Sequence, residues 1–358
     1  GKFIMELVKT VRKLQPKAML CSRVGFGLGD YISQGDMEVP LSNIDGLWET
    51  CDTNNDSWSY TWYDENFKSS KEILQRLIST VARGGSYLFN IGLKGTGEIP
   101  ELGQLFLEKT GEWIKKYPFV IYGAGSSPWG KALPWGDITT QRDKLYLNIY
   151  DWPKDGKIHL PGFDGKIVSV KLLTENKSLD VPHLKENDWT VFSLPGTQSD
   201  YPISVVEVAL ASDQFTVDKT IGIIPNHENL LHVEHSEVYN VKREEIRWME
   251  KFGEWKHVNQ ASNWETSGKV SWEINIKKPG FYHLGLSFKG NGRLVWRVQT
   301  KEGKIVQNQH EATNKYALYD LGLIEFKNPG RNTISVSLIE GDTKSASLKA
   351  IELKSIKY

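Results

Sequence analysis

The sequence of 358 residues predicts an α/β segment followed by antiparallel β structure. Helical and strand-like stretches alternate from residue 1 to about 122, which is typical of a parallel sheet covered by helices. After that point, short alternating strands are separated by Pro, Asp and Gly turns. A closed (β/α)8 barrel needs eight strands over roughly 250 residues. Because the first segment offers about three strands, we expect the C-terminal half of a (β/α)8-like barrel, then an antiparallel β-sandwich and a second, jelly-roll-like β module.

Shifts in composition predict the boundaries of these parts. We expect the partial (β/α)8-like barrel at residues 1–122, the β-sandwich at 123–212, a linker at 213–227 and the second β module at 228–358. Pro-Gly, Gly-Asn-Gly, Glu-Gly and Gly-Asp turns separate the expected strands of the last module.

Apolar spacing predicts three helices in the first part. They are "GKFIMELVKTVRKLQP", which Pro16 ends, "SSKEILQRLISTVARGG", with a serine start and a glycine stop, and "ELGQLFLEKTGEWIKKY". The expected strands between them are "KAMLCSR", "IDGLWET" and "SYLFNIG". The chain begins inside a helix with no signal-peptide pattern before it, so we expect a fragment of a longer protein.

Composition argues against several classes of function. The chain has 44 basic and 44 acidic residues and no long block of one sign, so we expect no nucleic-acid partner. Its apolar runs are shorter than the roughly 20 residues of a membrane helix, so we expect no membrane span. In "HVEHSE", His232 and His235 would face opposite sides of a strand, and we expect no metal site there. Cys21 and Cys51 are expected to be free thiols.

Polar side chains fall where the first strands are expected to end. Arg23, Glu49 and Asn90 each lie at or near the C-terminal end of an expected strand, where barrels carry their chemistry. A carboxylate beside a tryptophan, as in "WET", suits general-acid work because burial raises its pKa. A surface or salt-bridged glutamate is the alternative reading of Glu49. The tripeptide recurs at residues 264–266, so it decides nothing by itself.

A set of motifs, in a fixed order along the chain, narrows the range of possible functions. The motifs are "WETCDTNNDSWSY", "GGSYLFNIGLKGTGEIP", "GEWIKKYPFVIYG", "SPWGKALPWGDIT" and "LYLNIYDWPKDGKIHLPGF". In that order and spacing, residues 1 to about 210 resemble the second half of the catalytic region of α-L-fucosidases of glycoside hydrolase family 29. The resemblance implies an exo-acting retaining enzyme that removes terminal α-L-fucose from a fucosylated glycan, without a cofactor or a metal.

The resemblance also implies roles for individual residues. Glu49 matches the acid/base, Arg23 a substrate-binding arginine, and Trp58 an aromatic residue that lines the sugar pocket. The aspartate nucleophile and the fucose-binding histidines of the family are expected upstream of residue 1. We therefore expect this chain alone to be inactive.

The last module is less closely matched. With the segments "KKPGFYHLGLSFKG" and "GRNTISVSLIEGD…LKAIELK", residues 228–358 resemble jelly-roll carbohydrate-binding modules of secreted bacterial glycosidases. Trp255, Trp264 and Trp272 are candidates for a sugar platform, although core packing is favoured for each. The alternative functions are a non-catalytic carbohydrate-binding protein with a barrel remnant and a glycosidase of another sugar specificity. We expect a periplasmic or extracellular location, and the sequence predicts neither the fucosyl linkage nor the oligomeric state.

Overall fold

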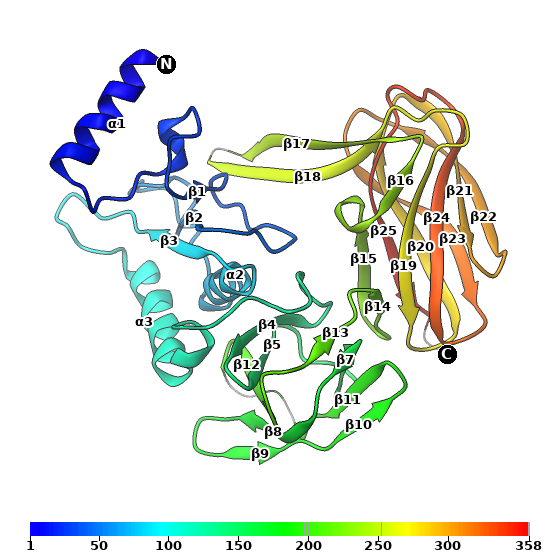
Figure 1. Ribbon diagram of the computed structural model, residues 1–358, viewed down its shortest axis with the longest axis horizontal. Coiled ribbons are helices and arrows are strands. Elements are labelled where there is room, and N and C mark those ends of the chain that lie inside the picture. Colours follow the sequence, from blue (N-terminus) through cyan, green and yellow to red (C-terminus); the bar gives the residue numbers. More distant parts are fainter. Residues whose placement is uncertain (197, 199–200, 252, 357–358) are drawn as a thin grey trace.

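The computed structural model describes residues 1–196, 198, 201–251 and 253–356. Figure 1 shows the helices gathered in the N-terminal part, a second part made of short strands, and a C-terminal sandwich of long strands. The coarse expectation of an α/β segment followed by antiparallel β structure is confirmed. The half-barrel and jelly-roll descriptions, and the domain boundaries, stay predictions.

The N-terminal part contains a parallel sheet and three α-helices. The strands lie in the order β1 (Ile32–Ser33), β2 (Trp48–Thr53) and β3 (Ser86–Asn90), and the helices are α1 (Lys2–Leu14), α2 (Ser70–Ala82) and α3 (Glu101–Lys116). The helix α2 begins with a capping box in which Ser69 and Glu72 bond reciprocally to each other's backbone. It buries Ile73, Leu74 and Ile78, as its apolar spacing predicts.

Two of the expected strands differ from the structure. Within "KAMLCSR" only Cys21 pairs, in an isolated parallel bridge to Tyr31. Met19 in this segment is exposed, so the segment has little buried face to hold it in a sheet, and the chain turns into a short 3-10 helix at Ser22–Val24. The expected strand "IDGLWET" begins only at Trp48 and continues to Thr53. Glu49 is therefore the second residue of β2 and lies near its N-terminal end, which corrects the expectation for that residue.

The described residues of the second part form three sheets. Its strands are β4 (Gly136–Gln141), β5 (Lys144–Ile149), β6 (Lys157–Pro161), β7 (Phe163–Asp164), β8 (Ile167–Leu173), β9 (Ser178–Asp180), β10 (His183–Glu186), β11 (Trp189–Ser193), β12 (Ser204–Leu210) and β13 (Thr216–Val217). The sheets have the orders β4-β5-β12-β8-β9, β10-β11-β6 and β13-β7. They enclose an apolar core that includes Trp135, Leu147 and Phe192.

In the C-terminal part, the residues that the structure describes form two six-stranded sheets around one core. Its strands are β14 (Ile221–Ile223), β15 (Glu228–His232), β16 (Glu237–Tyr239), β17 (Lys242–Lys251), β18 (Glu254–Ser262), β19 (Lys269–Ile276), β20 (Gly280–Lys289), β21 (Gly292–Thr300), β22 (Ile305–Ala312), β23 (Ala317–Phe326), β24 (Gly330–Glu340) and β25 (Ser347–Ser355). Trp264 and Trp272 are buried in this core and are not available as a sugar platform, whereas Trp255 is half-buried outside it.

The segment expected as a linker carries two short strands. β13 pairs with β7 of the second part, and β14 pairs with β19 of the C-terminal part. Each half of the segment is thus joined to a different sheet.

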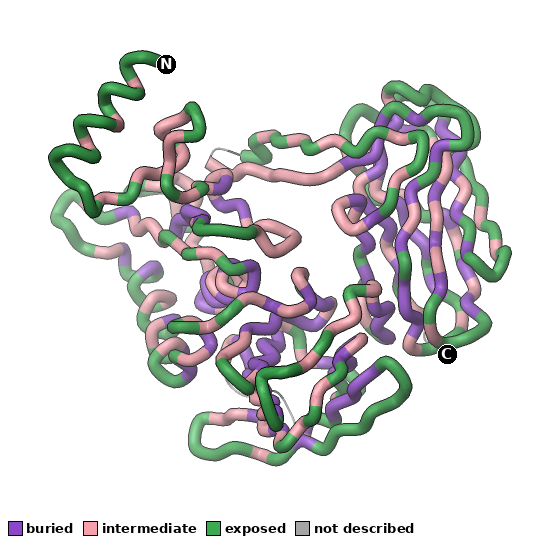
Figure 2. Tube along the Cα trace, viewed as in Figure 1, coloured by how far each residue is buried: buried purple, intermediate pink, exposed green. Residues whose placement is uncertain are grey.

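Burial is uneven along the chain. Figure 2 shows buried residues recurring along the strands of the C-terminal sandwich, whereas α1 is exposed or half-buried throughout. Part of the apolar side of α1 is exposed, since Phe3 is 78% exposed, whereas Ile4, Val8 and Val11 are half-buried. Among the residues that the structure describes, no helix is long and apolar enough to cross a membrane.

Candidate active site

The parallel sheet has two chemically different faces. Side chains alternate along a strand, so Trp48, Thr50 and Asp52 of β2 point to one face and are buried. Glu49 and Cys51 point to the other face, which we call the site face. The register places Ser33 of β1 and Ser86 of β3 on either side of Glu49.

Arg23 lies over the site face and is held by several partners. Its Nε donates to Ser33 Oγ at 3.1 Å, and one terminal nitrogen donates to Cys51 Sγ at 3.1 Å and to the Gln34 carbonyl at 3.3 Å. The same nitrogen forms an ion pair with Asp36. These contacts come from two segments, residues 33–36 and β2, so the guanidinium position is fixed while about half of the side chain remains exposed.

Cys51 and Asp36 complete the support of Arg23. The Cys51 thiol donates to Asp36 Oδ1 at 3.0 Å. Burial, and then the neighbouring Asp36 carboxylate, raise the pKa of Cys51 to about 12. The thiol is therefore protonated at neutral pH and acts as a hydrogen-bond donor rather than a nucleophile. Neither Asp36 nor Cys51 was predicted from the sequence to belong to the site.

Glu49 is half-buried on the same face as Cys51, two residues away along β2. Two residues of a strand span roughly 6.6 Å, so the Glu49 carboxylate and the Arg23 guanidinium share one area of the sheet. Tyr31 lies beside Glu49. Burial raises the pKa of the Tyr31 phenol, and the charge of Glu49 raises it further. Tyr31 is thus a neutral donor next to the carboxylate.

Trp58 lies beyond the C-terminal end of β2. Its backbone carbonyl accepts a hydrogen bond from Asn90 Nδ2 at 2.8 Å, and the same amide nitrogen donates to Thr53 Oγ1 at 2.9 Å. Asn90 is the last residue of β3, as predicted. Trp58 adopts a left-handed backbone conformation with φ of 61°, which is rare for a bulky residue. The structure therefore places Trp58 beyond the C-terminal end of β2, whereas Glu49 lies near the N-terminal end of the same strand.

An ion cluster supports the strand from the other face. The buried Asp52 carboxylate pairs with Arg76 of α2 and with Lys68 at 3.2 Å, and it accepts the Tyr87 hydroxyl at 2.6 Å. Burial alone would raise the pKa of Asp52, but the charges of Arg76 and Lys68 outweigh it and hold that pKa below its usual value. This cluster holds β2 against α2, and so it also fixes the position of the Glu49 backbone in the sheet.

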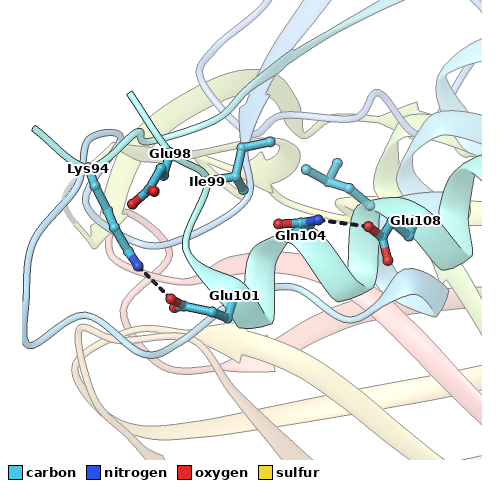
Figure 3. A pocket seen from close by; sticks show the side chains of 7 residues that line it. Lys94, Glu98, Ile99, Glu101, Gln104 and Glu108 are labelled. Carbon is cyan, nitrogen blue, oxygen red and sulfur yellow. Dashed lines mark hydrogen bonds and ion pairs between the residues drawn. The ribbon is translucent and has the colours of Figure 1, made fainter. Parts of the chain in front are cut away.

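A hollow of about 640 Å³ lies beside α3, on the loop that follows β3. Figure 3 shows Lys94 turned toward Glu101, and Gln104 turned toward Glu108. Lys94 pairs with Glu101 at 2.6 Å, and Gln104 donates to Glu108 at 2.8 Å. None of the predicted site residues lines this hollow.

The two clustered histidines lie at the end of a strand and in the turn that follows it. His232 ends β15, and His235 lies in the following 3-10 turn, where its Nε2 is 2.9 Å from Ser42 Oγ. Within the described ranges, no group of three or more His, Cys, Asp or Glu side chains is arranged to hold a metal ion.

Comparison with known proteins points to one family. Residues 2–118 match the family model for alpha-L-fucosidase. This range contains Arg23, Glu49 and Trp58. The tissue alpha-L-fucosidase of Rattus norvegicus is 30% identical over 188 residues, and that of Mus musculus is 31% identical over 141 residues. These alignments cover 49% and 37% of this chain, and they span only 37% and 30% of the two relatives.

Solved structures extend the likeness in fold. The alpha-L-fucosidase from Vibrio sp. strain EJY3 superposes with a TM-score of 0.73 at 24% identity, covering 98% of this chain and 63% of that protein. Alpha-L-fucosidase isoenzyme 1 from Paenibacillus thiaminolyticus gives a TM-score of 0.52 at 29% identity, covering 58% of this chain and 53% of that one. The likeness to the Vibrio protein thus includes the C-terminal sandwich, but as fold only.

Proposed function

We propose that the protein is an α-L-fucosidase of glycoside hydrolase family 29, which releases terminal α-L-fucose from glycans with retention of configuration. The observation that carries the proposal is the family match over residues 2–118, because that range includes the site face with Arg23 and Glu49. The relatives named alpha-L-fucosidase support the same reaction. The coarser conclusion, a glycoside hydrolase, rests on the same match.

We assign Glu49 the role of acid/base. In a retaining glycosidase one carboxyl group protonates the departing oxygen and later removes a proton from the attacking water, while a second carboxylate forms the glycosyl-enzyme. Glu49 suits the first role because it is half-buried and adjoins the neutral Tyr31 phenol. The strand β2, fixed by the Asp52 cluster, holds it in place.

Arg23 is assigned to the binding of sugar hydroxyl groups. A guanidinium presents five N–H donors in a fixed fork, and the contacts to Ser33 and Asp36 orient this one while leaving part of it exposed. Trp58 is assigned to an apolar wall, since the C–H face of a sugar ring packs on aromatic side chains. These roles follow the expectations from the sequence.

The repeated tripeptide supplies a matched test. In the full-length protein, Glu49→Ala is compared with Glu265→Ala, which alters an exposed glutamate in the second "WET" copy. We expect Glu49→Ala to lower turnover of fucosides with poor leaving groups roughly 10²- to 10⁴-fold, the usual contribution of general acid catalysis. Activated aryl fucosides should lose far less, because their leaving groups need no proton, and azide should restore part of the loss.

The outcomes separate the assignments. Equal loss on both substrate types, without rescue by azide, would move the acid role away from Glu49. A wild-type protein that hydrolyses another aryl glycoside but no fucoside would contradict the substrate assignment. Following the anomeric proton of the first-formed product by NMR would test retention, since an inverting enzyme releases the β-anomer.

A further inference from the structure

A hairpin of the C-terminal sandwich reaches back to the α/β part. It consists of β17 and β18, which extend from the sandwich toward the N-terminal sheet in Figure 1. Its strand "KREEIRWMEK" has one mainly charged face and one face on which Glu244, Ile246 and Trp248 are half-buried, and none of its residues is fully buried. Because β17 buries no complete face, contacts at the end of the hairpin add to its pairing with β18 in setting its position.

The hairpin is attached by charge. Glu38, which follows β1, is 5% exposed, and its carboxylate accepts His257 Nδ1 at 2.8 Å and Arg247 at 3.0 Å. Lys251 at the end of β17 pairs with Asp56 at 2.7 Å. A carboxylate as buried as Glu38 is costly without partners, and the hairpin supplies two of them. The loops that carry Glu38 and Asp56 both follow the C-terminal ends of parallel strands.

The tip of the hairpin touches residues of the candidate site. The Trp255 amide donates to the Asp36 carbonyl at 2.9 Å, and Asp36 in turn holds Arg23. The Trp58 indole nitrogen donates to the Gly253 carbonyl at 3.3 Å. The indole also lies against the Gly253 α-carbon so closely that an added Cβ would overlap it, at 2.6 Å from Trp58 Cδ1.

We propose that the β17–β18 hairpin forms one wall of the carbohydrate site and that Gly253 is a positioning residue for Trp58. The inference rests on the proposed function. The C-terminal module then acts on catalysis through direct contact, because it sets where the aromatic wall stands at the C-terminal edge of the sheet. The hairpin occupies the place of an active-site loop, although it belongs to a distant part of the sequence.

Gly253→Ala tests the contact, with Gly303→Ala as its control. Both glycines lie in turns of the C-terminal part with positive φ, 69° and 82°, so both substitutions add similar backbone strain. A Cβ at Gly303 meets nothing within 4 Å. In the full-length protein we expect Gly253→Ala to lower kcat/KM for an aryl α-L-fucoside roughly 10- to 100-fold, mainly through KM. Gly303→Ala should stay within about twofold of wild type.

A double variant shows whether the effect acts through Trp58. In a Trp58→Ala background the added methyl group has nothing to displace, so Gly253→Ala should cause no further rise in KM. This double variant also remains readable if the single variant fails to fold, because the overlap is gone. Arg247→Met, which weakens the attachment without changing the turn, should raise KM roughly two- to fivefold, as expected for a half-exposed ion pair.

Two failures are distinguishable. If wild type hydrolyses no fucoside and binds no fucose by calorimetry, the proposed function fails. If wild type is active but Gly253→Ala matches Gly303→Ala, the hairpin has no role at the site and the inference is overturned. Equal effects of Gly253→Ala with and without Trp58 would likewise overturn the assignment of Gly253 as the residue that positions Trp58.

Discussion

Replacing Asp52 with Asn removes one charge from the cluster that holds β2. The carboxylate is fully buried and serves Arg76, Lys68 and Tyr87. Breaking a buried pair by removing one partner costs about 3–5 kcal/mol. The Arg76 and Lys68 side chains are 25% and 16% exposed, so solvent screens part of their uncompensated charge. We therefore expect the free energy of unfolding of the α/β part to fall by roughly 2–4 kcal/mol.

The same cluster predicts a dependence on pH. The folded-state pKa of Asp52 is lowered, so the carboxylate stabilises the fold above its unfolded pKa of about 3.9. That stabilisation is lost as the pH falls through the lower folded-state value. The difference between wild type and Asp52→Asn should thus be constant near neutrality and shrink below about pH 4.

The measurement is denaturation by urea, followed by the fluorescence of the buried Trp48 and Trp113. The control is Asp151→Asn, because Asp151 also pairs with a lysine of α2, Lys71 at 3.0 Å, but is 73% exposed. We expect that control to cost about 0–1 kcal/mol. Equal losses in the two variants, or a loss from Asp52→Asn that persists unchanged below pH 4, would refute the argument that the buried charge holds the strand.

Two further predictions concern a buried histidine and an amide. Burial lowers the pKa of His159 to about 4, so the unfolded chain takes up its proton from about pH 6.5 downward while the folded chain does not. The free energy of unfolding should therefore decrease as the pH falls from about 6.5 to about 4, both in wild type and in the exposed-site control His283→Gln. In His159→Gln this decrease should be less steep. Thermal unfolding at several pH values measures the difference. Asn90→Ala removes the hydrogen bonds to Thr53 and Trp58, so we expect about 1–3 kcal/mol lower stability and a raised KM for aryl fucosides, neither of which should occur in the exposed-site control Asn308→Ala.

Local sequence signals located the helices better than the strands. The boundaries of α2 follow from neighbouring residues alone, since Ser69 and Glu72 cap it and its apolar spacing fixes the buried side. A strand needs a partner that local sequence does not name. The segment "KAMLCSR" has the composition of a strand, yet its exposed Met19 and single bridge at Cys21 show that no second strand pairs along it.

In the candidate site too, local sequence signals found some residues, whereas contacts between distant residues were missed. Arg23, Glu49 and Trp58 were predicted from contiguous motifs, and the structure brings Arg23 and Glu49 to one face of the sheet. The support of this site was missed, because it joins residues that are 195 and 209 positions apart, as in the contacts of Trp58 with Gly253 and of Glu38 with Arg247. One feature of the sequence could have indicated these contacts. The ten-residue strand β17 is rich in charged residues and has no complete apolar face, which is not typical of a strand that covers the core of a sandwich.

The two copies of the "WET" tripeptide show how position gives the same residues different chemistry. In the first copy the tripeptide is part of β2, so alternation buries Trp48 on one face of the sheet and places Glu49 on the site face beside Tyr31. In the second copy the residues lie in a turn between β18 and β19. Trp264 is again buried, against Trp296, but Glu265 is exposed. A buried tryptophan therefore accompanies both glutamates and cannot by itself make either one an acid. What distinguishes Glu49 is a strand whose other face is fixed by buried charge, and the comparison of Glu49→Ala with Glu265→Ala measures that difference with the local sequence held constant.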